Sequence, residues 1–195
     1  MPTFTSLPLD TERLILRPYR PEDTNAVFEM FSDPRVMRYW SWLPWTELDQ
    51  AKDAVTRDIE AYEGGRYLRL GIERREDHAF LGQCILLNFV AHSRRAEIGY
   101  SLASWAWGRG YMHEALEKLV CYGFESLNLN RLEADIDPRN EASARSLERL
   151  GFLREGLMRD RWIVGDEVSD TAFYGLLRKD WKSPAHGHGA TSPFH

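Results

Sequence analysis

The chain has 195 residues, of which 43% are hydrophobic and 28% are charged, and this balance is typical of a globular protein rather than a disordered one. The formal net charge is -5 and no basic stripe is present, which argues against a dedicated nucleic-acid-binding protein. The sequence contains no run of about 18 apolar residues, which a membrane-spanning helix would need, and its first residues lack the pattern of a secretory signal. We therefore expect a cytoplasmic protein without a membrane partner.

The first half of the chain predicts two helices followed by an antiparallel meander. Pro21 opens the first helix, whose first turn is acidic, and Asp33-Pro34 ends it, while Thr46 is expected to cap the second helix. Short polar links join the later strands, as hairpin connections do. The expected elements are a strand over 14–17, helices over 21–32 and 46–62, and strands over 67–73, 80–89 and 95–102.

The second half alternates strands with helices, so the expected sheet is mixed and carries helices on its faces. Its expected elements are helices over 112–127 and 140–150 and strands over 131–136, 152–161 and 171–177. Residues 1–182 are expected to form one domain, and the tail 183–195, rich in glycine, histidine and serine, is expected to be disordered. Cys84 and Cys121 are expected to be buried free thiols, and because they do not form a CxxC pair, no metal site is expected.

A glycine-containing loop before the helix over 112–127 is the most informative stretch. It reads Trp107-Gly108-Arg109-Gly110-Tyr111-Met112-His113. Backbone N–H groups in the first turn of a helix lack internal partners, and the helix dipole favours an anion there, so the loop is a candidate seat for a pyrophosphate. Its glycines let the backbone approach the ligand, and Arg109 can add a charge-assisted bond. The alternative is a plain tight turn, because the third glycine of a dinucleotide fold and the Gly-Lys of a P-loop are both missing.

The segment WGRGYMHEAL resembles the acetyl-CoA signature of the GNAT acetyltransferase superfamily, and in particular that of its RimJ/RimL-type branch. Three further segments are similar to that branch and occur in the same order. They are the opening TERLILRPYRPEDTNAVFEMFSDPRVMRYW, the strand AEIGYSL before the loop, and NRLEADIDPRNEASARSLERLGFLREGLMRD after the long helix. The resemblance covers Leu9 to Trp181, and such motifs found together in order are strongly specific.

The resemblance implies an α+β GNAT fold, which is a mixed, mostly antiparallel sheet flanked by helices, with a V-shaped splay between two parallel strands, here 97–102 and 132–136. It implies an N-acetyltransferase that moves acetyl from acetyl-CoA to a primary amine by direct attack on the thioester. The pyrophosphate then lies on the loop amides and the pantetheine arm lies in the splay. The implied cofactor-binding residues are Ser101, Leu102, Trp107, Gly108, Arg109, Gly110, Tyr111, Met112, His113, Asn140 and Ser143.

Two residues of the loop depart from the family pattern. Trp107 stands where many members carry glutamine or arginine, although tryptophan is usual in this branch, and Met112 stands where alanine or glycine is expected. Met112 either crowds the phosphates or points away. Crowding favours a second interpretation, an acyl-CoA-binding module or sensor without turnover. His113 is either a neighbour of the phosphates or a plain surface histidine.

An acceptor amine has to lose a proton before it attacks, because an alkyl ammonium has a pKa near ~10.4. Glu97 lies on the strand beside the implied cofactor, with Gly99 and Ser101 on the same face by strand alternation, and is the candidate base. The alternative for Glu97 is a structural pair with an arginine. Many family members use a tyrosine to protonate the leaving thiolate at the position that Leu147 occupies here. Ser143 is the nearest hydroxyl on that helix and is the candidate group near the sulfur.

The helix over 140–150 opens with residues that suit two roles. Asn140 is a good N-cap and can also contact the pantetheine, and helix capping is the alternative role of Ser143. Gly151 is expected to end this helix in a left-handed conformation, with Phe152 folding back on Leu147.

The acceptor site is implied by the position of aromatic residues. Trp40 and Trp42 lie where the family places the acceptor wall, and with Glu97 they form the implied substrate-binding set; core packing is the alternative for these two and for Trp45. The expected acceptor is a protein N-terminus or a small-molecule amine, and the expected state is a monomer or a homodimer. Two acids that line either the acceptor entrance or a solvated strand face are Glu155 and Asp160.

Overall fold

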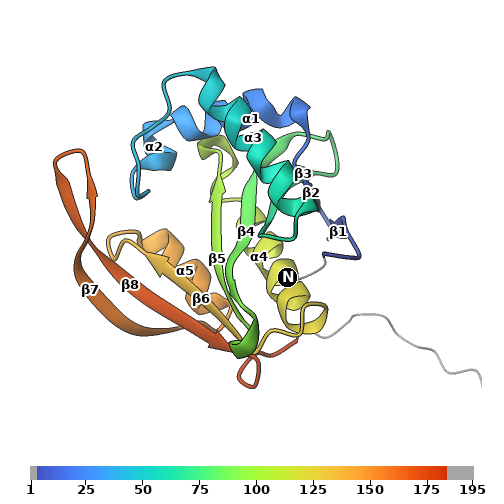
Figure 1. The fold of residues 1–195 in the computed structure, drawn as a ribbon, viewed down its shortest axis with the longest axis vertical. Coiled ribbons are helices and arrows are strands. Elements are labelled where there is room, and N and C mark those ends of the chain that lie inside the picture. The colour runs from blue at the N-terminus through green and yellow to red at the C-terminus, as the bar shows by residue number, and fades with distance from the viewer. Residues whose placement is uncertain (1–3, 184–195) are drawn as a thin grey trace, which may run out of the picture.

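A computed structural model describes residues 4–183, and an eight-stranded sheet runs through this part of the chain (Figure 1). The strand order across the sheet is β1-β2-β3-β4-β5-β6-β8-β7. Neighbouring strands are antiparallel except β5 and β6, which are parallel. The strands are β1 (Leu9–Asp10), β2 (Leu14–Pro18), β3 (Leu68–Arg74), β4 (Phe80–Val90), β5 (Arg95–Leu102), β6 (Arg131–Ile136), β7 (Leu153–Val164) and β8 (Glu167–Leu177).

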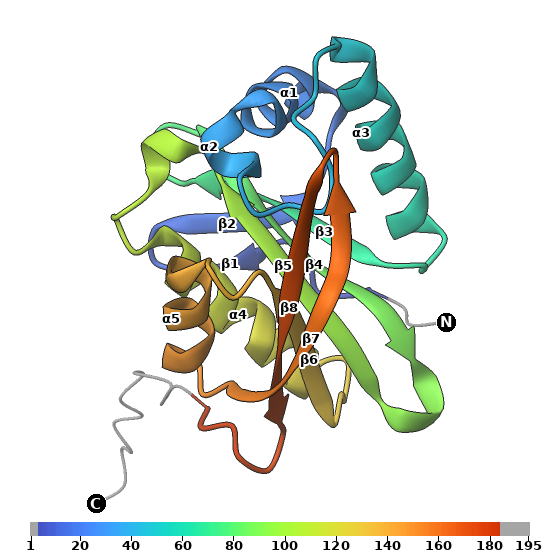
Figure 2. The ribbon, with the colours of Figure 1, turned by 90° about the vertical axis from the view of Figure 1, so that its left-hand side faces the viewer.

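Two groups of helices flank this sheet (Figures 1 and 2). The first three helices pack together, where Val27, Phe31 and Val55 form a small buried cluster with other apolar side chains. Leu116 and Leu119 of α4 instead join the main core beneath the strands. The helices are α1 (Thr24–Ser32), α2 (Pro34–Met37), α3 (Leu48–Glu63), α4 (Tyr111–Glu125) and α5 (Glu141–Arg149), with 3₁₀ turns at Pro21–Asp23, Ala91–Ser93 and Ser104–Ala106.

β5 and β6 part after a short shared segment. Their parallel register consists of the pairs Arg95↔Arg131, Ala96↔Leu132 and Glu97↔Glu133. Beyond this segment β5 stays paired with β4 as far as Leu102, and β6 stays paired with β8 as far as Ile136. The two strands therefore open into a V, which is visible where β5 and β6 diverge in Figure 1. This is the splay that the family resemblance predicts.

The helix boundaries show one wrong prediction and one unpredicted element. Asp33-Pro34 ends α1 as expected, but α2 begins at once, because the Asp33 carboxylate accepts the Arg35 N–H at 2.9 Å and acts as a new N-cap. The predicted cap of α3 at Thr46 is wrong. Glu47 is the N-cap, because the Gln50 side chain accepts the backbone N–H groups of Thr46 and Glu47 at 2.9 and 3.0 Å.

The predicted end of α5 is confirmed. Gly151 has a φ of +92°, which is left-handed and favours glycine, and the Phe152 N–H donates to the Leu147 carbonyl at 3.0 Å. Leu147 and Phe152 are both buried, so the chain turns back on the core at this point.

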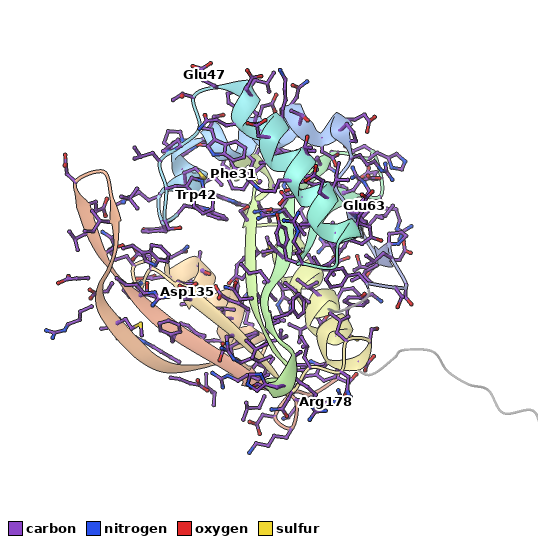
Figure 3. All side chains as sticks on the ribbon, viewed as in Figure 1. Phe31, Trp42, Glu47, Glu63, Asp135 and Arg178 are labelled. Carbon is purple, nitrogen blue, oxygen red and sulfur yellow. The ribbon has the colours of Figure 1, made fainter. Side chains whose placement is uncertain are left out.

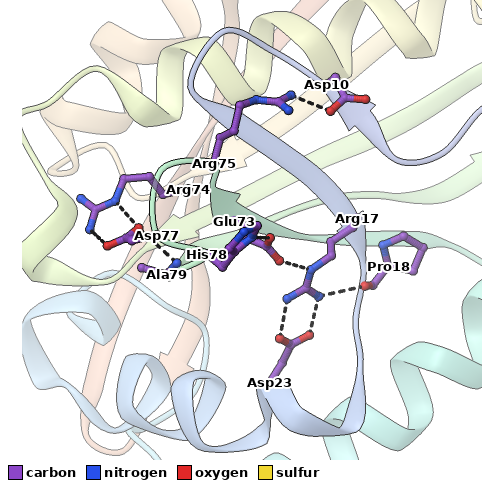
Figure 4. Close-up of polar contacts among 10 residues, drawn as sticks. All are labelled: Asp10, Arg17, Pro18, Asp23, Glu73, Arg74, Arg75, Asp77, His78 and Ala79. Atoms are coloured by element: carbon purple, nitrogen blue, oxygen red, sulfur yellow. Dashed lines mark hydrogen bonds and ion pairs between the residues drawn. The ribbon is translucent and has the colours of Figure 1, made fainter.

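A buried ion cluster ties the opening strand to its neighbours (Figure 4). Arg17 of β2 donates to both carboxylate oxygens of Asp23 at 2.8 Å and to Glu73 of β3 at 2.5 Å, and all three side chains are at most 8% exposed. His78 Nδ1 lies 2.7 Å from the second oxygen of Glu73. Burial alone raises the pKa of Glu73, but the bonds from Arg17 and His78 outweigh it and hold that pKa below the usual value.

The two cysteines differ in their surroundings. Cys84 is buried as predicted, and burial raises the pKa of its thiol to about 12. Cys121 is only half-buried, which corrects the prediction, because its position on α4 turns the thiol toward Glu125, whose carboxylate lies 3.2 Å from Sγ. Within 4–183 there is no helix of the length and apolarity that spanning a membrane requires. The predicted disordered tail lies outside the described residues, apart from Ser183.

Candidate functional site

The loop before α4 presents backbone amides without protein partners. Gly108 and Gly110 have φ values of +73° and +77°, and Gly110 is the N-cap of α4. The first return bond of the helix runs from the Glu114 N–H to the Gly110 carbonyl at 3.2 Å, and the amides of 108–113 find no acceptor in the described part of the chain. A Cβ on Gly108 meets nothing within 4 Å, so the loop backbone borders open space. These features fit the predicted seat for a pyrophosphate.

Arg13 and Glu114 fasten this loop to the start of the sheet. The Glu114 carboxylate accepts hydrogen bonds from Thr11 Oγ1 at 2.6 Å, from the Arg13 backbone at 2.8 Å and from Arg13 Nε at 2.7 Å. Arg13 Nη1 donates to the Arg109 carbonyl at 3.0 Å, and its guanidinium lies 4.8 Å from the centre of the Tyr111 ring. This anchor was not predicted, and the one local signal for it in the sequence is an acid in the first turn of the helix.

The residues that depart from the family pattern do not crowd the loop. Met112 is half-buried and packs against the main core, so it points away from the amides. The Trp107 indole donates from Nε1 to the Leu102 carbonyl at 3.0 Å and closes the turn between β5 and α4. His113 is half-buried, and its Nδ1 is buried without a hydrogen-bond partner in the structure described, so His113 is not a plain surface histidine.

Side chains of β5 alternate between two sides of the sheet. Ser101 is buried on the side of α1, where its Oγ lies 3.5 Å from Sδ of Met30. Tyr100 points to the other side and reaches Ser143 at the start of α5. Glu97 shares the face of Ser101, because residues two apart on a strand point the same way. The face of α1 to α3 therefore carries the candidate base, and the opposite face carries the hydroxyls of Tyr100 and Ser143.

Glu97 is the last residue of β5 that pairs with β6 and lies at the vertex of the V. Its carboxylate accepts the Asn88 side-chain amide at 2.8 Å. Burial raises the pKa of Glu97 above its usual value, the bond from Asn88 opposes this rise, and repulsion from Asp135 and Glu133 adds to it. The alternative of a structural arginine pair is not formed among the residues described, since Arg95 binds Glu133 instead. Such a carboxylate suits a general base.

In the first turn of α5, the predicted catalytic residue Ser143 contacts Tyr100, which was not predicted. Asn140 caps the helix, as expected, by accepting the Ser143 N–H at 3.1 Å. Ser143 is 9% exposed, and its Oγ lies 2.7 Å from Tyr100 Oη. Tyr100 was not among the predicted site residues, although its place between Gly99 and Ser101 puts it on the helix side of β5.

Trp40, Trp42 and Trp45 gather around Phe31 of α1. Their ring centres lie 5.3, 6.3 and 4.7 Å from that of Phe31, and Trp40 and Trp42 are 4.6 Å apart. Trp40 and Trp45 are half-buried against the α1–α3 cluster, which fits core packing, whereas Trp42 is 39% exposed. Figure 3 shows Trp42 beside α2, with Asp135 on β6 across from it. Trp42 is therefore the member of the group that an acceptor can touch.

An ion-pair network joins the end of α2 to the second half of the sheet. Glu167, at the start of β8, lies 3.2 Å from Arg38 and 2.6 Å from Arg139, which also binds Asp137 at 2.5 Å. The guanidinium groups of Arg38 and Arg139 lie 5.4 and 5.9 Å from the centre of the Tyr39 ring. The network connects elements on either side of the V, and in Figure 1 the tip of the β7–β8 hairpin reaches toward α2.

A cavity of about 690 Å³ adjoins Glu97. It is lined by Asn88, Phe89, Val90, Arg95, Glu97, Glu133 and Phe173.

The two acids predicted to line either the acceptor entrance or a solvated strand face differ in their surroundings. Glu155 binds Arg131 at 3.0 Å, whereas Asp160 is exposed where the register between β7 and β8 shifts. Within 4–183 we find no cluster of three or more potential metal ligands.

Residues 13–153 match the model of the acetyltransferase (GNAT) domain. The chain belongs to the GNAT acetyltransferase family. The uncharacterized N-acetyltransferase p20 of Bacillus licheniformis is 37% identical to it, over 89% of this chain and 97% of that protein. The spermidine N(1)-acetyltransferase of Escherichia coli K12 is 30% identical, over 77% and 78% of the two chains. A GNAT-family acetyltransferase structure from Bacillus anthracis, 25% identical, has a TM-score of 0.79 over 88% and 98% of the chains.

These likenesses confirm the predicted GNAT fold and the predicted RimJ/RimL-type branch, because the relatives include ribosomal-protein acetyltransferase-like proteins. They also confirm the predicted enzyme class, an N-acetyltransferase that takes its acetyl group from acetyl-CoA and gives it to an amine. The V between β5 and β6 and the free amides before α4 are the parts of this GNAT chain that fit such a donor.

Proposed function

We propose that this GNAT enzyme acetylates the primary amine of a small cationic molecule, with Glu97 as the base that frees the amine. One observation carries the proposal: Glu97 lies at the vertex of the V, and its carboxylate has a raised pKa and no arginine partner among the described residues. Glu133 pairs with Glu97 across the vertex, and Asp135 lies two residues further along β6. Because Glu133 is paired with Arg95 and Arg131, the negative charge that favours a positively charged acceptor is that of Glu97 and Asp135.

The donor is held by the loop and by β5. The amides of 108–113 and Arg109 would hold the pyrophosphate, the backbone near Ser101 and Leu102 would pair with the pantetheine arm, and His113 would be a neighbour of the phosphates. Acetyl-CoA supplies an acetyl group that is already activated as a thioester. The remaining work of the protein is to orient the amine, to remove its proton and to stabilise the charge that develops on oxygen and sulfur.

The transfer follows from the two faces of β5. Glu97 accepts the proton of the amine on the α1–α3 side, the amine nitrogen bonds to the acetyl carbon, and the carbon–sulfur bond breaks. Backbone N–H groups of β5 beyond the vertex no longer face β6 and are available to the carbonyl oxygen. The Ser143 hydroxyl donates a hydrogen bond to the sulfur from the α5 side. Because Met112 points into the core, the feature that favoured a module without turnover is absent.

The acceptor enters between the aromatic wall and β6. Trp42 offers an exposed ring that can stack on a cation or an apolar chain. Arg38, Glu167 and Arg139 form ion pairs on this side of the molecule. The similarity to a spermidine acetyltransferase agrees with a small acceptor. A protein N-terminus is the competing acceptor.

A panel of acceptors tests this function. The enzyme is incubated with acetyl-CoA and either spermidine, propylamine or a peptide with a free N-terminus, and released thiol is followed. We expect the highest kcat/KM for the polyamine and a lower value for the peptide. A peptide preference overturns the small-molecule acceptor, and saturable coenzyme binding without turnover on any amine overturns the enzyme itself. The monomer or homodimer state and the cytoplasmic location stay predictions, which sedimentation and cell fractionation check.

A further inference from the structure

A side-chain hydrogen bond connects the two arms of the V on the face away from the acceptor. The parallel pairing of β5 with β6 stops at Glu97 and Glu133. Tyr100 lies three residues further along β5, and Ser143 lies in the first turn of α5, the helix that follows β6. Their hydroxyl oxygens are 2.7 Å apart, so this contact forms where the two backbones have already separated.

Either hydroxyl can be the donor in the contact between Tyr100 Oη and Ser143 Oγ, so the hydroxyl proton of Ser143 can point away from Tyr100. The Ser143 N–H is bound to Asn140 Oδ1 at 3.1 Å, which fixes the backbone of the first turn. The Tyr100 phenol has two acceptors, Ser143 Oγ at 2.7 Å and the Ser143 carbonyl at 3.3 Å. The shorter contact has the usual length of an O–H···O bond, whereas the longer one exceeds it. When Tyr100 donates to Oγ, the serine hydroxyl has to donate elsewhere.

We propose that Tyr100 is a positioning residue of the acetyl transfer: by donating to Ser143 Oγ, it aims the Ser143 hydroxyl at the sulfur of the coenzyme. The inference rests on the proposed function, in which the thiol-bearing arm lies in the V. In the transfer, the carbon–nitrogen bond forms and the carbon–sulfur bond breaks, with its electron pair remaining on sulfur. Glu97 takes the amine proton. Ser143 keeps its proton and stabilises the thiolate through a hydrogen bond, until solvent protonates the sulfur.

A tyrosine suits this task because its phenol stays protonated. Burial raises the pKa of Tyr100 above its usual value, the bond to Ser143 opposes the rise, and the neighbouring Tyr174 adds to it. Tyr100 therefore remains a donor throughout the working pH range. Leu147, one turn further along α5, is apolar and buried, so the phenol beside Ser143 comes from β5.

The first test is a double-mutant cycle. We expect Tyr100→Phe to lower kcat about tenfold, with the KM for acetyl-CoA changed less than about twofold, because the hydrogen bond matters when charge develops on sulfur. Ser143→Ala is expected to lower kcat about tenfold or more. The double variant should be no slower than Ser143→Ala, because Tyr100 acts through the serine. Equal losses from Tyr100→Phe in both backgrounds overturn the proposal, as does a loss confined to KM.

The second test needs no turnover. Enzyme saturated with coenzyme A is treated with iodoacetamide over a range of pH, and the alkylation rate gives the pKa of the bound thiol, because only the thiolate reacts. A hydrogen bond from Ser143 stabilises the thiolate, so the thiol pKa should be lower in the wild-type complex than in either single variant. An unchanged pKa in Tyr100→Phe overturns the role of the tyrosine.

Tyr122→Phe is the matched control. Tyr122 is a buried tyrosine of α4 whose hydroxyl donates to the Thr5 carbonyl at 2.9 Å, on the face that packs against the N-terminal segment. The Tyr122→Phe variant should leave kcat and the pKa of the bound thiol unchanged. A thiol pKa that does not rise in Ser143→Ala removes the serine from the sulfur and overturns the proposal, even if Tyr100→Phe does not fold. Failure of the proposed function is a different result, in which the wild-type enzyme acetylates no amine.

Discussion

Glu97 and Glu133 face each other across the vertex of the V, but their surroundings make them different acids. Glu133 is held by Arg95 and by Arg131, the latter at 2.8 Å, whereas Glu97 receives one side-chain amide, from Asn88. Two guanidinium groups occupy the Glu133 carboxylate, whereas Glu97 has no cationic partner among the described residues and has a raised pKa, which suits a general base. The side chains that bind each glutamate, rather than its place in the register, therefore identify Glu97 as the base.

Replacing Glu97 by glutamine tests this choice. We expect kcat to fall about 100-fold or more, with little change in the KM for acetyl-CoA, because the carboxylate removes a proton and does not touch the donor. The wild-type activity should rise with pH through a pKa above the usual glutamate value, since burial raises the pKa of Glu97 and the deprotonated form is the active one. That limb should disappear in the variant. Glu76→Gln, in an exposed turn, is the control, and equal profiles for the two variants would contradict the role of Glu97.

Residue roles could be predicted where the signal is local and not where it depends on a distant partner. Asn140 was predicted as a cap because its partner is three residues away. Arg13 and Glu114 are separated by about a hundred positions, and no periodicity in the sequence links them. Tyr100 lies inside a predicted motif, but its role depends on Ser143 of another element.

At the scale of elements, the loop before α4 depends on the anchor that Glu114 provides. We expect Glu114→Gln to raise the KM for acetyl-CoA roughly threefold to tenfold with a smaller effect on kcat, because the loop amides lose their fixed orientation. Burial alone raises the pKa of Glu114, but the bonds from Thr11 and Arg13 outweigh it and lower that pKa. The stability that this anchor contributes is present above the unfolded-state pKa and is lost as pH falls through the lowered folded-state value. Initial-rate kinetics measure the KM and kcat, and melting temperatures at pH 7 and pH 4 measure the stability. Glu117→Gln, on the same helix, is the control for both measurements.

The buried cluster around Arg17 makes a second element-scale prediction. Arg17→Met should lower the free energy of unfolding by about 3–5 kcal/mol, because Asp23 and Glu73 are left buried without their cation. Urea denaturation measures the change. Adding Asp23→Leu and Glu73→Leu removes the uncompensated charges and should restore much of the loss. If the triple variant is no more stable than Arg17→Met, the charges are not the cause.

All strands except the two-residue β1, and the long helices, were predicted, because hydrophobic alternation and helical spacing are properties of single segments. The splay could not be predicted from spacing, since it depends on which neighbour each strand keeps. β5 stays paired with β4 and β6 stays paired with β8, and the parallel pairing of β5 with β6 ends at Glu97. The family resemblance predicted the splay, which hydrophobic periodicity does not indicate. α2 escaped prediction because Pro34 and Arg35 follow a break, and the cap by Asp33 is a matter of local geometry.

The whole molecule consists of two sheet segments joined at the vertex of the V. One segment runs from β1 to β5 and the other contains β6, β8 and β7, and the short parallel pairing of β5 with β6 is the only strand pairing that joins them in the described structure. Tyr100 with Ser143 and the network around Glu167 add side-chain contacts on either side. A coenzyme in the V touches both segments, so its binding should reduce amide hydrogen exchange in β6 and α5 as well as in the loop before α4.

Heat protection by coenzyme A tests the proposed seat as a property of the whole molecule. At about 100 times its Kd the ligand should stabilise the fold by about 2.7 kcal/mol, which for a chain of this size is a rise in melting temperature of about 5–10 °C. Gly110→Ala should reduce the shift at fixed coenzyme concentration, because its φ of +77° is strained for alanine and any relaxation moves the amides that hold the phosphates. Gly165→Ala, at φ +59° in the β7–β8 turn, carries the same kind of strain far from the loop and should keep the full shift. Equal shifts in the two variants would mean that the diphosphate is bound elsewhere.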